Sequence, residues 1–480
     1  MTSTTSLMEE SSAAAAAVAL LPVEREGQLM GLANRMQRCV NSAEENLGNM
    51  EEELLRGSHE LMRQMLEKAA QAKAVAVPPR CPECQQPLRC LSGGHRTTIQ
   101  TRFGSIQVER VRGKCRRCQR WRFPADKVLG LPAEGTQSPA VQEIAALTVS
   151  KMPATEAEQL VERLVGIKIS AATLGRQARQ QGERAQEKRQ GLDQQMSGPE
   201  GRVQQDRDLQ MQLPLEPFTL VIELDAWNIR ERDAWGDSAA HRARGEEPPR
   251  WHWVYGGTCF RLGHRGETAS GRATILSRGY AMTRGGMAAL REQIWAEASR
   301  RGLGRANEVL IVADGAVWIW NLAGDRFPGA RQRVDFYHVS EHLWAVARTL
   351  HPDDETAARA WIEPLLTKLK ADDSCAVITA LEELRPRLEG AAGEHLEREI
   401  NYLQTNRQRL DYGTAKARGE PLGSGAMEST CRQYQCRFKR PGQFWTQTGD
   451  EALLCLETFR RNGRWHLLFP HAAPIDPSKN

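Results

Sequence analysis

Two nearly continuous apolar runs, each ending in an aspartate, constrain the fold of this 480-residue chain more than any other feature. Phe218–Leu224 leads into Asp225, and Glu308–Ala313 leads into Asp314. Such runs are typical of central strands buried on both faces. A carboxylate at the end of a buried strand is unfavourable for stability but useful for chemistry, because active sites of open α/β sheets gather at that edge. The runs therefore predict an α/β domain with an acidic site.

The segments around these runs predict the rest of a mixed sheet. Three further strands are expected, in Trp251–Phe260, Ala273–Thr283 and Arg333–Phe336. Gly286–Arg301 places its apolar residues on one helical stripe. Residues 339–410 have a helical pattern, and another helix is expected from about Ala426. The order strand, strand, strand, helix, strand, helix, strand indicates an α/β domain with a mixed sheet.

The amino-terminal part of the chain divides by composition. We expect a disordered segment in residues 1–24, a helical arm in 25–73, a cysteine-rich module in 78–125 and a helical region in 138–192. The Gln-rich and charged residues 193–214 are expected to form a linker to the α/β domain. The chain is therefore expected to be a multidomain protein, α/β plus α.

No part of the chain predicts a membrane span or a secretion signal. No run of 18 or more apolar residues occurs. The short apolar run Ala13–Leu21 follows Glu9 and Glu10, whereas a signal peptide has basic residues there. We therefore expect a cytoplasmic protein without a membrane partner.

Four of the 11 cysteines form two C-x-x-C knuckles, Cys81–Cys84 and Cys115–Cys118. The thirty residues between the knuckles include two strand-like stretches around a Phe103-Gly104 turn, which predict a hairpin. Four thiolates on two tight turns can enclose a tetrahedral Zn²⁺, so a structural zinc ribbon is expected. Cys90 or His95 could compete as a ligand, and buried cysteines without metal are the alternative.

Basic residues concentrate around the cysteine knuckles. From Arg80 to Phe123, 11 Lys/Arg residues stand against two acids, although the whole chain has a net charge of only +5. Such a patch is typical of nucleic-acid binding, and Arg116 and Arg117 are candidate phosphate contacts. A solvated, arginine-rich loop region is the alternative.

A helix-turn-helix pattern follows in the sequence. Thr155–Val165 and Ser170–Gln180 are helical, with Gly166 in the turn and Ser170 as N-cap. Arg176 and Arg179 lie on the second helix, where a recognition helix would contact double-stranded DNA. An ordinary helical hairpin has the same pattern.

A third acid, Glu428, follows the turn Gly423-Ser424-Gly425 at a helix start, and basic residues follow it. These are Arg432, Arg437, Lys439 and Arg440. With Asp225 and Asp314, Glu428 could hold two Mg²⁺ or Mn²⁺ ions together with substrate phosphate. Taken singly, Asp314-Gly315 could be a turn and Glu428 a first-turn acid favoured by the helix dipole.

Three blocks of the chain resemble a known family. The first is Val312-Ala313-Asp314-Gly315-Ala316-Val317-Trp318-Ile319-Trp320-Asn321. The second is Phe327-Pro328-Gly329-Ala330 with Val334-Asp335-Phe336-Tyr337-His338 and Glu341-His342-Leu343. The third is Gly423-Ser424-Gly425-Ala426-Met427-Glu428-Ser429 with Arg437-Phe438-Lys439-Arg440-Pro441-Gly442 and Trp445. Together they resemble bacterial insertion-sequence DDE transposases of the ISKra type, within the Mutator-like group.

This resemblance implies Mg²⁺-dependent DNA cleavage and strand transfer at element ends by Asp225, Asp314 and Glu428. It implies a ribonuclease H-like core in residues 215–340 and 421–470, interrupted by a helical insertion in 341–420. Glu223, two residues before Asp225, would point to the same strand face and is an alternative first acid. A homodimer or larger assembly on DNA is expected, because transposases usually bring two ends together.

The block around His338 allows a second interpretation. Asp335-x-x-His338 resembles the acid-x-x-His signature of the Mutator-like group, which suggests an accessory role at the metal site or the flanking DNA. His338, Glu341 and His342 also match H-x-x-E-H, the inverted zinc-protease motif. A non-catalytic DNA-binding protein derived from a transposase is a third possibility.

Three tryptophans near the predicted acidic site have two possible roles. Trp318, Trp320 and Trp445 could stack on unpaired bases near a cleaved end. Core packing is the alternative, above all for Trp318, which closely follows Asp314.

Overall fold

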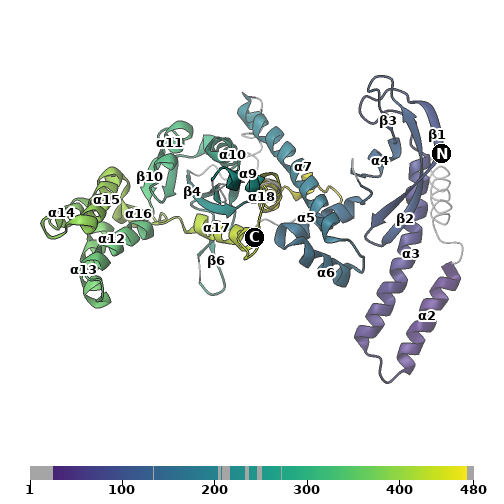
Figure 1. Cartoon of the computed structure of the whole chain (residues 1–480), viewed down its shortest axis with the longest axis horizontal. Helices are drawn as coiled ribbons and strands as arrows, with labels where there is room; N and C mark the ends of the chain where they lie inside the picture. Colours follow the sequence, from purple (N-terminus) through teal and green to yellow (C-terminus); the bar gives the residue numbers. More distant parts are fainter. Residues whose placement is uncertain are drawn as a thin grey trace, which may run out of the picture. The chain divides into compact units, whose positions relative to one another are not determined.

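The computed structural model describes residues 25–132, 135–199, 201–203, 207, 217–232, 237–245, 251–271 and 273–472. The expected disorder in residues 1–24 therefore concerns a segment outside the described residues. The chain divides into two compact units, Met1–Arg179 with Phe469–Ala472, and Gln180–Leu468 with Ala473–Asn480. Figure 1 shows their helices and strands, and each unit is described by itself below.

The first unit begins with two helices, α2 (Arg25–Asn41) and α3 (Leu47–Val75). The side chain of Asn46 caps α3 by accepting a hydrogen bond from the amide of Asn49. Ala70 and Ala74 of α3 pack against the apolar face of a three-stranded sheet. The expected helical arm is thus a helical pair whose second member belongs to the sheet's core.

The three-stranded sheet has the order β1 (Arg89–Thr101), β2 (Gly104–Lys114), β3 (Trp121–Arg122). β1 and β2 pair antiparallel through a turn that ends at Gly104, whose φ of 107° suits glycine. The hairpin expected between the cysteine knuckles is therefore present. A short helix, α4 (Pro124–Val128), follows the sheet.

Three helices complete this part of the chain: α5 (Pro139–Lys151), α6 (Ala154–Val165) and α7 (Ala171–Ser197). Gly166 ends α6 in the left-handed conformation, and the hydroxyl of Ser170 accepts a hydrogen bond from the amide of Thr173. The helix, turn and helix lie where the sequence predicted them. α7 continues well beyond Gln180, however. A single glycine within a helix is tolerated, as at Gly182 and Gly191, and the helix ends at Ser197, just before Gly198.

The second unit contains a five-stranded mixed sheet in the order β10-β9-β4-β5-β8. Its strands are β4 (Thr219–Arg230), β5 (Trp251–Arg261), β8 (Gly279–Thr283), β9 (Glu308–Ala313) and β10 (Arg331–Val334). β10, β9 and β4 are parallel, whereas β5 is antiparallel to both of its neighbours. The expected mixed α/β sheet is confirmed.

Helices cover both faces of this sheet. Leu220, Ile222 and Leu224 join the main core with α10 (Gly286–Arg300) and α11 (Val317–Arg326). The alternate residues Val221 and Val312 belong to a smaller cluster on the other face, where Ala426 of α17 (Gly425–Phe438) packs against it. α18 (Gln447–Arg461) follows α17.

A helical segment separates β10 from α17. It comprises α12 (Phe336–Leu350), α13 (Glu355–Lys370), α14 (Ser374–Glu382), α15 (Gly390–Asn406) and α16 (Tyr412–Ala417). The remaining short elements are α9 (Asp237–Ala243), β6 (Arg265–Glu267), β7 (Ala273–Ile275) and 3₁₀ turns at Leu303–Arg305, Arg385–Arg387, Arg407–Arg409 and Trp465–Leu467. No helix in the described part of the chain is long and apolar enough to cross a membrane.

Three details of the predicted sheet are wrong. The strand expected in Arg333–Phe336 is β10 (Arg331–Val334), because Asp335 caps a helix that begins at Phe336. Asp225 does not end its strand, because β4 stays paired with β5 as far as Arg230 opposite Trp251. Ala273–Thr283 is not one strand: β7 pairs only with β6, and β8 joins the large sheet separately. Ser277 and Arg278 between them make no ladder pairs.

Candidate functional site

The cysteine knuckles meet in one cluster of the first unit. All four sulfur atoms lie within 4.8 Å of one another, with 3.9 Å between Cys81 and Cys118 and 3.4 Å between Cys84 and Cys115. Four ligands at the Zn–S bond length of about 2.3 Å would be about 3.8 Å apart in a tetrahedron. The four cysteines therefore could bind a metal ion such as zinc.

The backbone of each knuckle favours this role. Gln85 and Gln119 follow the knuckles with φ near 55–60°, which turns the chain tightly around the sulfurs. Backbone amides of Cys84 and Glu83 lower the pKa of the Cys81 thiol, whereas hydrogen bonding to the neighbouring thiols raises the pKa of Cys118, so the four sulfur atoms act on one another as one cluster. Cys90 is exposed and does not belong to the cluster.

The basic residues around the cluster divide into two groups. Arg110 forms an ion pair with Asp126, and its guanidinium lies 4.2 Å from the centre of the Phe123 ring. Arg116 and Arg117, in contrast, are exposed within the second knuckle. Arg176 and Arg179 are likewise exposed on α7. These four side chains are accessible to a large anionic partner.

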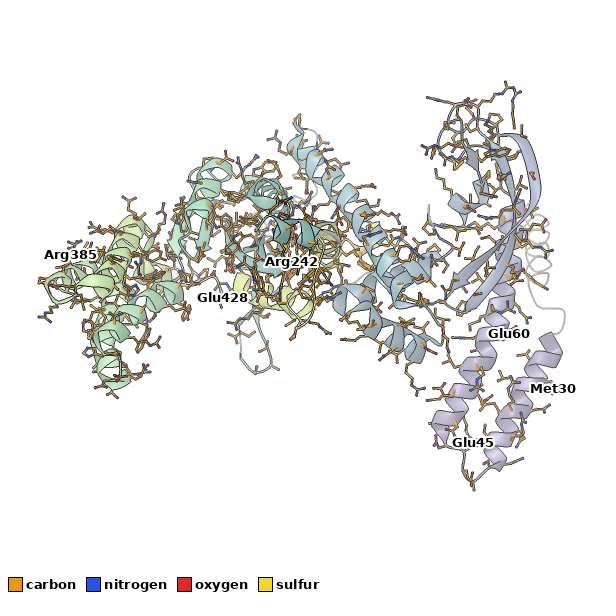
Figure 2. The ribbon with its side chains drawn as sticks, viewed as in Figure 1. Met30, Glu45, Glu60, Arg242, Arg385 and Glu428 are labelled. Atoms are coloured by element: carbon orange, nitrogen blue, oxygen red, sulfur yellow. The ribbon has the colours of Figure 1, made fainter. Side chains whose placement is uncertain are left out.

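The three predicted acids come from three elements of the second unit, and the charges of two of them act on Asp225. Asp225 lies on β4, and Asp314 directly follows β9. Glu428, labelled in Figure 2, lies in the first turn of α17. Burial raises the pKa of Asp225, the amide of Ala226 opposes this, and the charges of Asp314 and Glu428 raise it further. The fold thus brings together residues up to about 200 positions apart in sequence.

This acidic group has the donor chemistry of a divalent-cation site. Among the described residues, neither Asp225 nor Asp314 forms an ion pair within 4.0 Å, and half-exposed Glu428 pairs only with exposed Arg432. Neighbouring carboxylates without a buried base favour a cation. The carboxylate oxygens of the three acids do not all lie within 4.8 Å of one another. Among the described residues, only the four cysteine sulfurs are grouped that closely.

A pair of glycines on β5 allows close packing on both faces of the sheet beside Asp225. Gly256 is the ladder partner of Asp225, and a Cβ there would collide with the side-chain end of Met427 on α17. A Cβ at Gly257 would lie 2.8 Å from Leu224 on the other face. This close contact explains how Glu428, next to Met427, reaches Asp225. The glycine pair was not identified from the sequence, although two adjacent glycines within a strand are a signal of close backbone approach.

Glu223 supports the helix that carries Glu428 and does not belong to the acidic group. It is buried, and its carboxylate accepts a hydrogen bond of 2.7 Å from the amide of Met427. It therefore satisfies the amino-terminal turn of the helix that carries Glu428. Burial raises the pKa of Glu223 to about 8. The thiol of Cys431, one turn beyond Glu428, donates a hydrogen bond to the carboxylate of Asp225.

Asp314 is held by its own turn and by the helical segment. Its carboxylate accepts a hydrogen bond from the amide of Ala316, and its backbone carbonyl accepts one of 2.8 Å from the hydroxyl of Tyr402. Gly315 has φ 97°, and a Cβ there would lie 2.8 Å from the Tyr402 hydroxyl. The Asp-Gly sequence is thus a turn that also presents an acid. Tyr402, on α15, was missed because nothing near it in sequence indicates this contact.

Asp335 links two elements of the site. One carboxylate oxygen caps α12 by accepting hydrogen bonds from the amides of Tyr337 and His338. The other accepts from the amide and the hydroxyl of Ser424, at 2.6 and 2.7 Å. Asp335 is buried, so it positions the turn before Glu428 rather than contacting a substrate.

His338 and His342 lie one turn apart on α12, with their Nε2 atoms 3.2 Å apart. Nδ1 of His342 contacts the carboxylate of Glu399 at 2.5 Å, and its ring stacks on Tyr402 at 4.1 Å. No third His, Cys, Asp or Glu ligand atom of the described residues lies within 4.8 Å of both Nε2 atoms. The histidines alone therefore lack the third protein ligand of a zinc-protease site.

The basic residues after Glu428 have different environments. Arg432 and Lys439 are exposed, and Arg440 is half-buried. Arg437 is buried, with its guanidinium 4.8 Å from the centre of the Trp445 ring, so the expected DNA contact does not fit its position. The i, i+3 spacing from the buried Tyr434 indicates this inward face.

Of the three tryptophans considered for base stacking, two are buried. The indole of Trp320 donates to the carbonyl of Gly315, and that of Trp445 donates to the carbonyl of Phe438. Trp318 is half-buried, and its ring packs edge-to-face against the ring of Tyr255. Core packing therefore accounts for Trp320 and Trp445, and Trp318 packs on the sheet.

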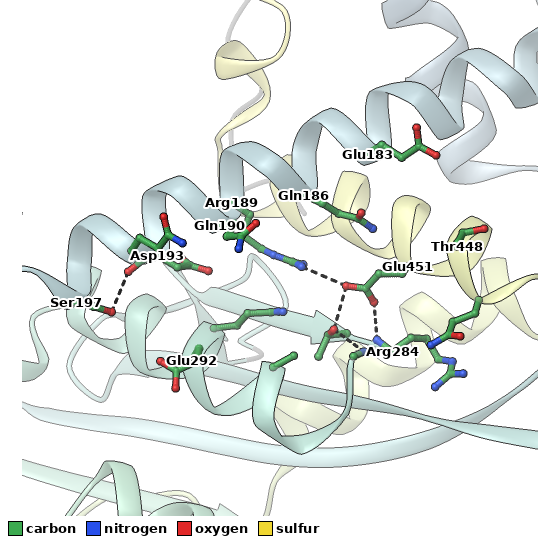
Figure 3. Close-up of a pocket in the computed structure, with 16 residues that line it drawn as sticks. Glu183, Gln186, Arg189, Gln190, Asp193, Ser197, Arg284, Glu292, Thr448 and Glu451 are labelled. Atoms are coloured by element: carbon green, nitrogen blue, oxygen red, sulfur yellow. Dashed lines mark hydrogen bonds and ion pairs between the residues drawn. The ribbon is translucent and has the colours of Figure 1, made fainter.

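The second unit also contains a cavity of about 660 Å³ between α7, α10 and α18 (Figure 3). Its charged groups are largely paired: Arg189 bonds Glu451, which also accepts from the hydroxyl of Thr283 and the amide of Arg284. None of the acids predicted from the sequence lines this cavity.

No protein-family model matches the chain, and a search of curated proteins finds no match.

Proposed function

We propose that the protein is a DDE-type DNA transposase that cleaves and joins DNA at the ends of an insertion sequence. One observation carries this proposal. Asp225, Asp314 and Glu428, which resemble the family's three acids, come from separate elements that the fold packs together: β4 pairs with β9, which Asp314 follows, and Met427, next to Glu428, packs against Gly256, the ladder partner of Asp225. The mixed sheet and the helical segment between Asp314 and Glu428 support a ribonuclease H-like core with an insertion.

In this proposal the three carboxylates hold two Mg²⁺ or Mn²⁺ ions, which activate the attacking oxygen and stabilise the leaving oxygen. The protein's own part is to position the acids. Glu223 holds the start of α17, Asp335 holds the turn before it, and Tyr402 holds the backbone of Asp314. Glu428, on the exposed side, is the acid that a substrate strand would approach.

DNA recognition belongs to the first unit in this proposal. The cysteine cluster, as a zinc ribbon, presents Arg116 and Arg117, and the helix-turn-helix presents Arg176 and Arg179. Phosphate contacts by such residues give binding that weakens steeply with salt. α2 and α3 leave Leu29, Met30 and other apolar residues exposed, which supports their use in a homodimer on paired DNA ends.

The test is cleavage of duplexes that span the element's own ends, in Mg²⁺, by wild type and by Asp314→Ala. Wild type should nick these duplexes, and Asp314→Ala should reduce the rate by at least a thousand-fold while binding DNA normally. Glu341→Gln is the matched control, because Glu341 is exposed and would be the base of the protease alternative. Equal cleavage by wild type and Asp314→Ala would refute the proposal. Specific DNA binding without any cleavage would favour the non-catalytic alternative.

A further inference from the structure

Exposed aromatic residues and arginines gather at the far end of the β4–β5 ribbon. Trp251, Trp253 and Phe444 are 59%, 51% and 43% exposed. The guanidinium of Arg230 lies 4.8 Å from the ring centre of Phe444 and 6.0 Å from that of Trp251, and Arg232 lies 5.8 Å from Phe444. We call these five residues the aromatic platform.

The pairing of the backbone explains why these side chains share a face. Arg230 and Trp251 are ladder partners, and Trp253 lies two residues along the same strand, so all three point the same way. Phe444 arrives from a separate segment beside β4. There the amide of Trp445 donates to the carbonyl of Arg230, and the amide of Arg232 donates to that of Trp445.

The segment that carries the exposed Phe444 also carries a buried aromatic residue. Trp445, next to Phe444, points to the opposite side and is buried against Phe438. The backbone thus turns one ring into the core and leaves its neighbour in solvent. Single exposed apolar side chains are ordinary, but three large rings interleaved with cations form a surface with ligand-binding chemistry.

That chemistry fits unpaired nucleotides. Every base offers a π-face, so exposed Trp and Phe rings bind single strands with little sequence preference, and arginines between them contact phosphates. Duplex DNA has its bases already stacked and offers no such face. The platform therefore fits a single-stranded segment better than a duplex.

The position of the platform relates it to the acidic site. Arg230 lies five residues beyond Asp225 on β4, which is about 16 Å along an extended strand. Stacked nucleotides rise about 3.4 Å each, so this span corresponds to about five nucleotides. Because five is odd, the two side chains point to opposite faces, so a DNA strand that passes around the ribbon's edge needs more than this direct span.

We propose that the aromatic platform binds unpaired bases of the DNA strand at least about five nucleotides from the phosphate held by the acids. This inference rests on the proposed transposase function and adds a substrate class, a strand that is single-stranded next to the cleavage point. Trp253 and Trp251 stack on bases, and Arg230 and Arg232 contact the backbone.

The test uses the full chain in buffer without Mg²⁺ or Mn²⁺, which prevents cleavage without removing structural zinc as a chelator would, and two DNAs with the same element-end duplex. One is blunt, and the other has a single-stranded flank of about ten nucleotides containing 2-aminopurine. Wild type should bind the flanked DNA more tightly and quench the 2-aminopurine fluorescence. Trp253→Ala should weaken binding of the flanked DNA about ten-fold and leave the blunt DNA unchanged.

Matched variants separate stacking from general apolar contact. Trp253→Phe keeps an aromatic face and should retain most of the preference, whereas Trp253→Leu should lose it. Leu276→Ala removes another exposed apolar side chain, 52% exposed, and should change neither affinity. Equal wild-type affinity for both DNAs, or an unchanged preference in Trp253→Ala, would overturn the inference while leaving the proposed function intact. Failure to bind either DNA would overturn both.

Discussion

The buried carboxyl group of Glu223 makes the stability of the second unit depend on pH in a way that one substitution should remove. The pKa of Glu223 is raised from 4.5 to about 8 by burial. Below pH 4.5 the group is protonated in both the folded and the unfolded chain. As the pH rises from 4.5 to 8, the unfolded chain releases this proton while the folded chain retains it. The wild type therefore loses stability across this window, and the loss is complete above pH 8.

The size of the effect follows from the two pKa values. A difference of about 3.5, at 1.36 kcal/mol for each, corresponds to about 5 kcal/mol at pH 8 and above. Glu223→Gln has the same shape and keeps an oxygen that accepts the 2.7 Å hydrogen bond from the amide of Met427. We therefore expect the variant to match wild type near pH 4.5. Its advantage in free energy of unfolding should grow by about 1.4 kcal/mol per pH unit towards pH 8.

The assay is urea unfolding followed by tryptophan fluorescence, in EDTA, at several values between pH 5 and 8. Trp121 is the one tryptophan in the first unit, so the signal reports mainly on the second. Glu341→Gln is the control, because this carboxylate is 80% exposed and its removal should leave the curve unchanged. If the free energies of unfolding of wild type and Glu223→Gln changed in parallel between pH 5 and 8, the reasoning would be refuted.

Three further predictions concern the two sites. Cys115→Ser should abolish a stoichiometric zinc content measured by elemental analysis and make the first unit sensitive to protease; retention of one zinc per chain would contradict the assignment. Gly256→Ala would place a Cβ against the flexible side-chain ends of Met427 and Met282, which can shift, and should lower Mg²⁺-dependent cleavage modestly, whereas Gly263→Ala, with nothing within 4 Å, should not change it. Tyr402→Phe should cost about 1 kcal/mol in thermal unfolding and slow cleavage, and an unchanged rate would show that its hydroxyl does not position the acidic site.

The sequence predicted those parts of the fold that depend on local pattern. The apolar runs before Asp225 and Asp314 are strands because near-continuous Val, Ile and Leu suit a position buried on both faces. Gly166 and Ser170 marked the helix-turn-helix because capping chemistry is local. The end of β4 was misplaced because it depends on its pairing with β5, which no pattern within β4 records.

The candidate site shows the same division. Its three acids were identified from the sequence, two of them at strand positions and one at a helix start. The residues that position them were not, because their contacts span long separations in sequence: Tyr402 reaches Asp314, and Glu223 reaches Met427. Glu223 was considered as an acid of the site because its spacing from Asp225 places both on one face. The structure separates the two by depth, since Glu223 is buried under α17 while Asp225 remains partly accessible.

The turn before Glu428 connects these observations. Two buried carboxylates fix it from different directions: Glu223 binds the amide of Met427, and Asp335 binds the amide and hydroxyl of Ser424. Glu428 itself makes only an exposed ion pair, which contributes little to its position. Its place beside Asp225 is therefore determined by residues that would touch neither cation nor DNA. Loss of either buried carboxylate should move Glu428 while leaving all three acids of the site in the chain, so activity should depend on residues outside the acid motif.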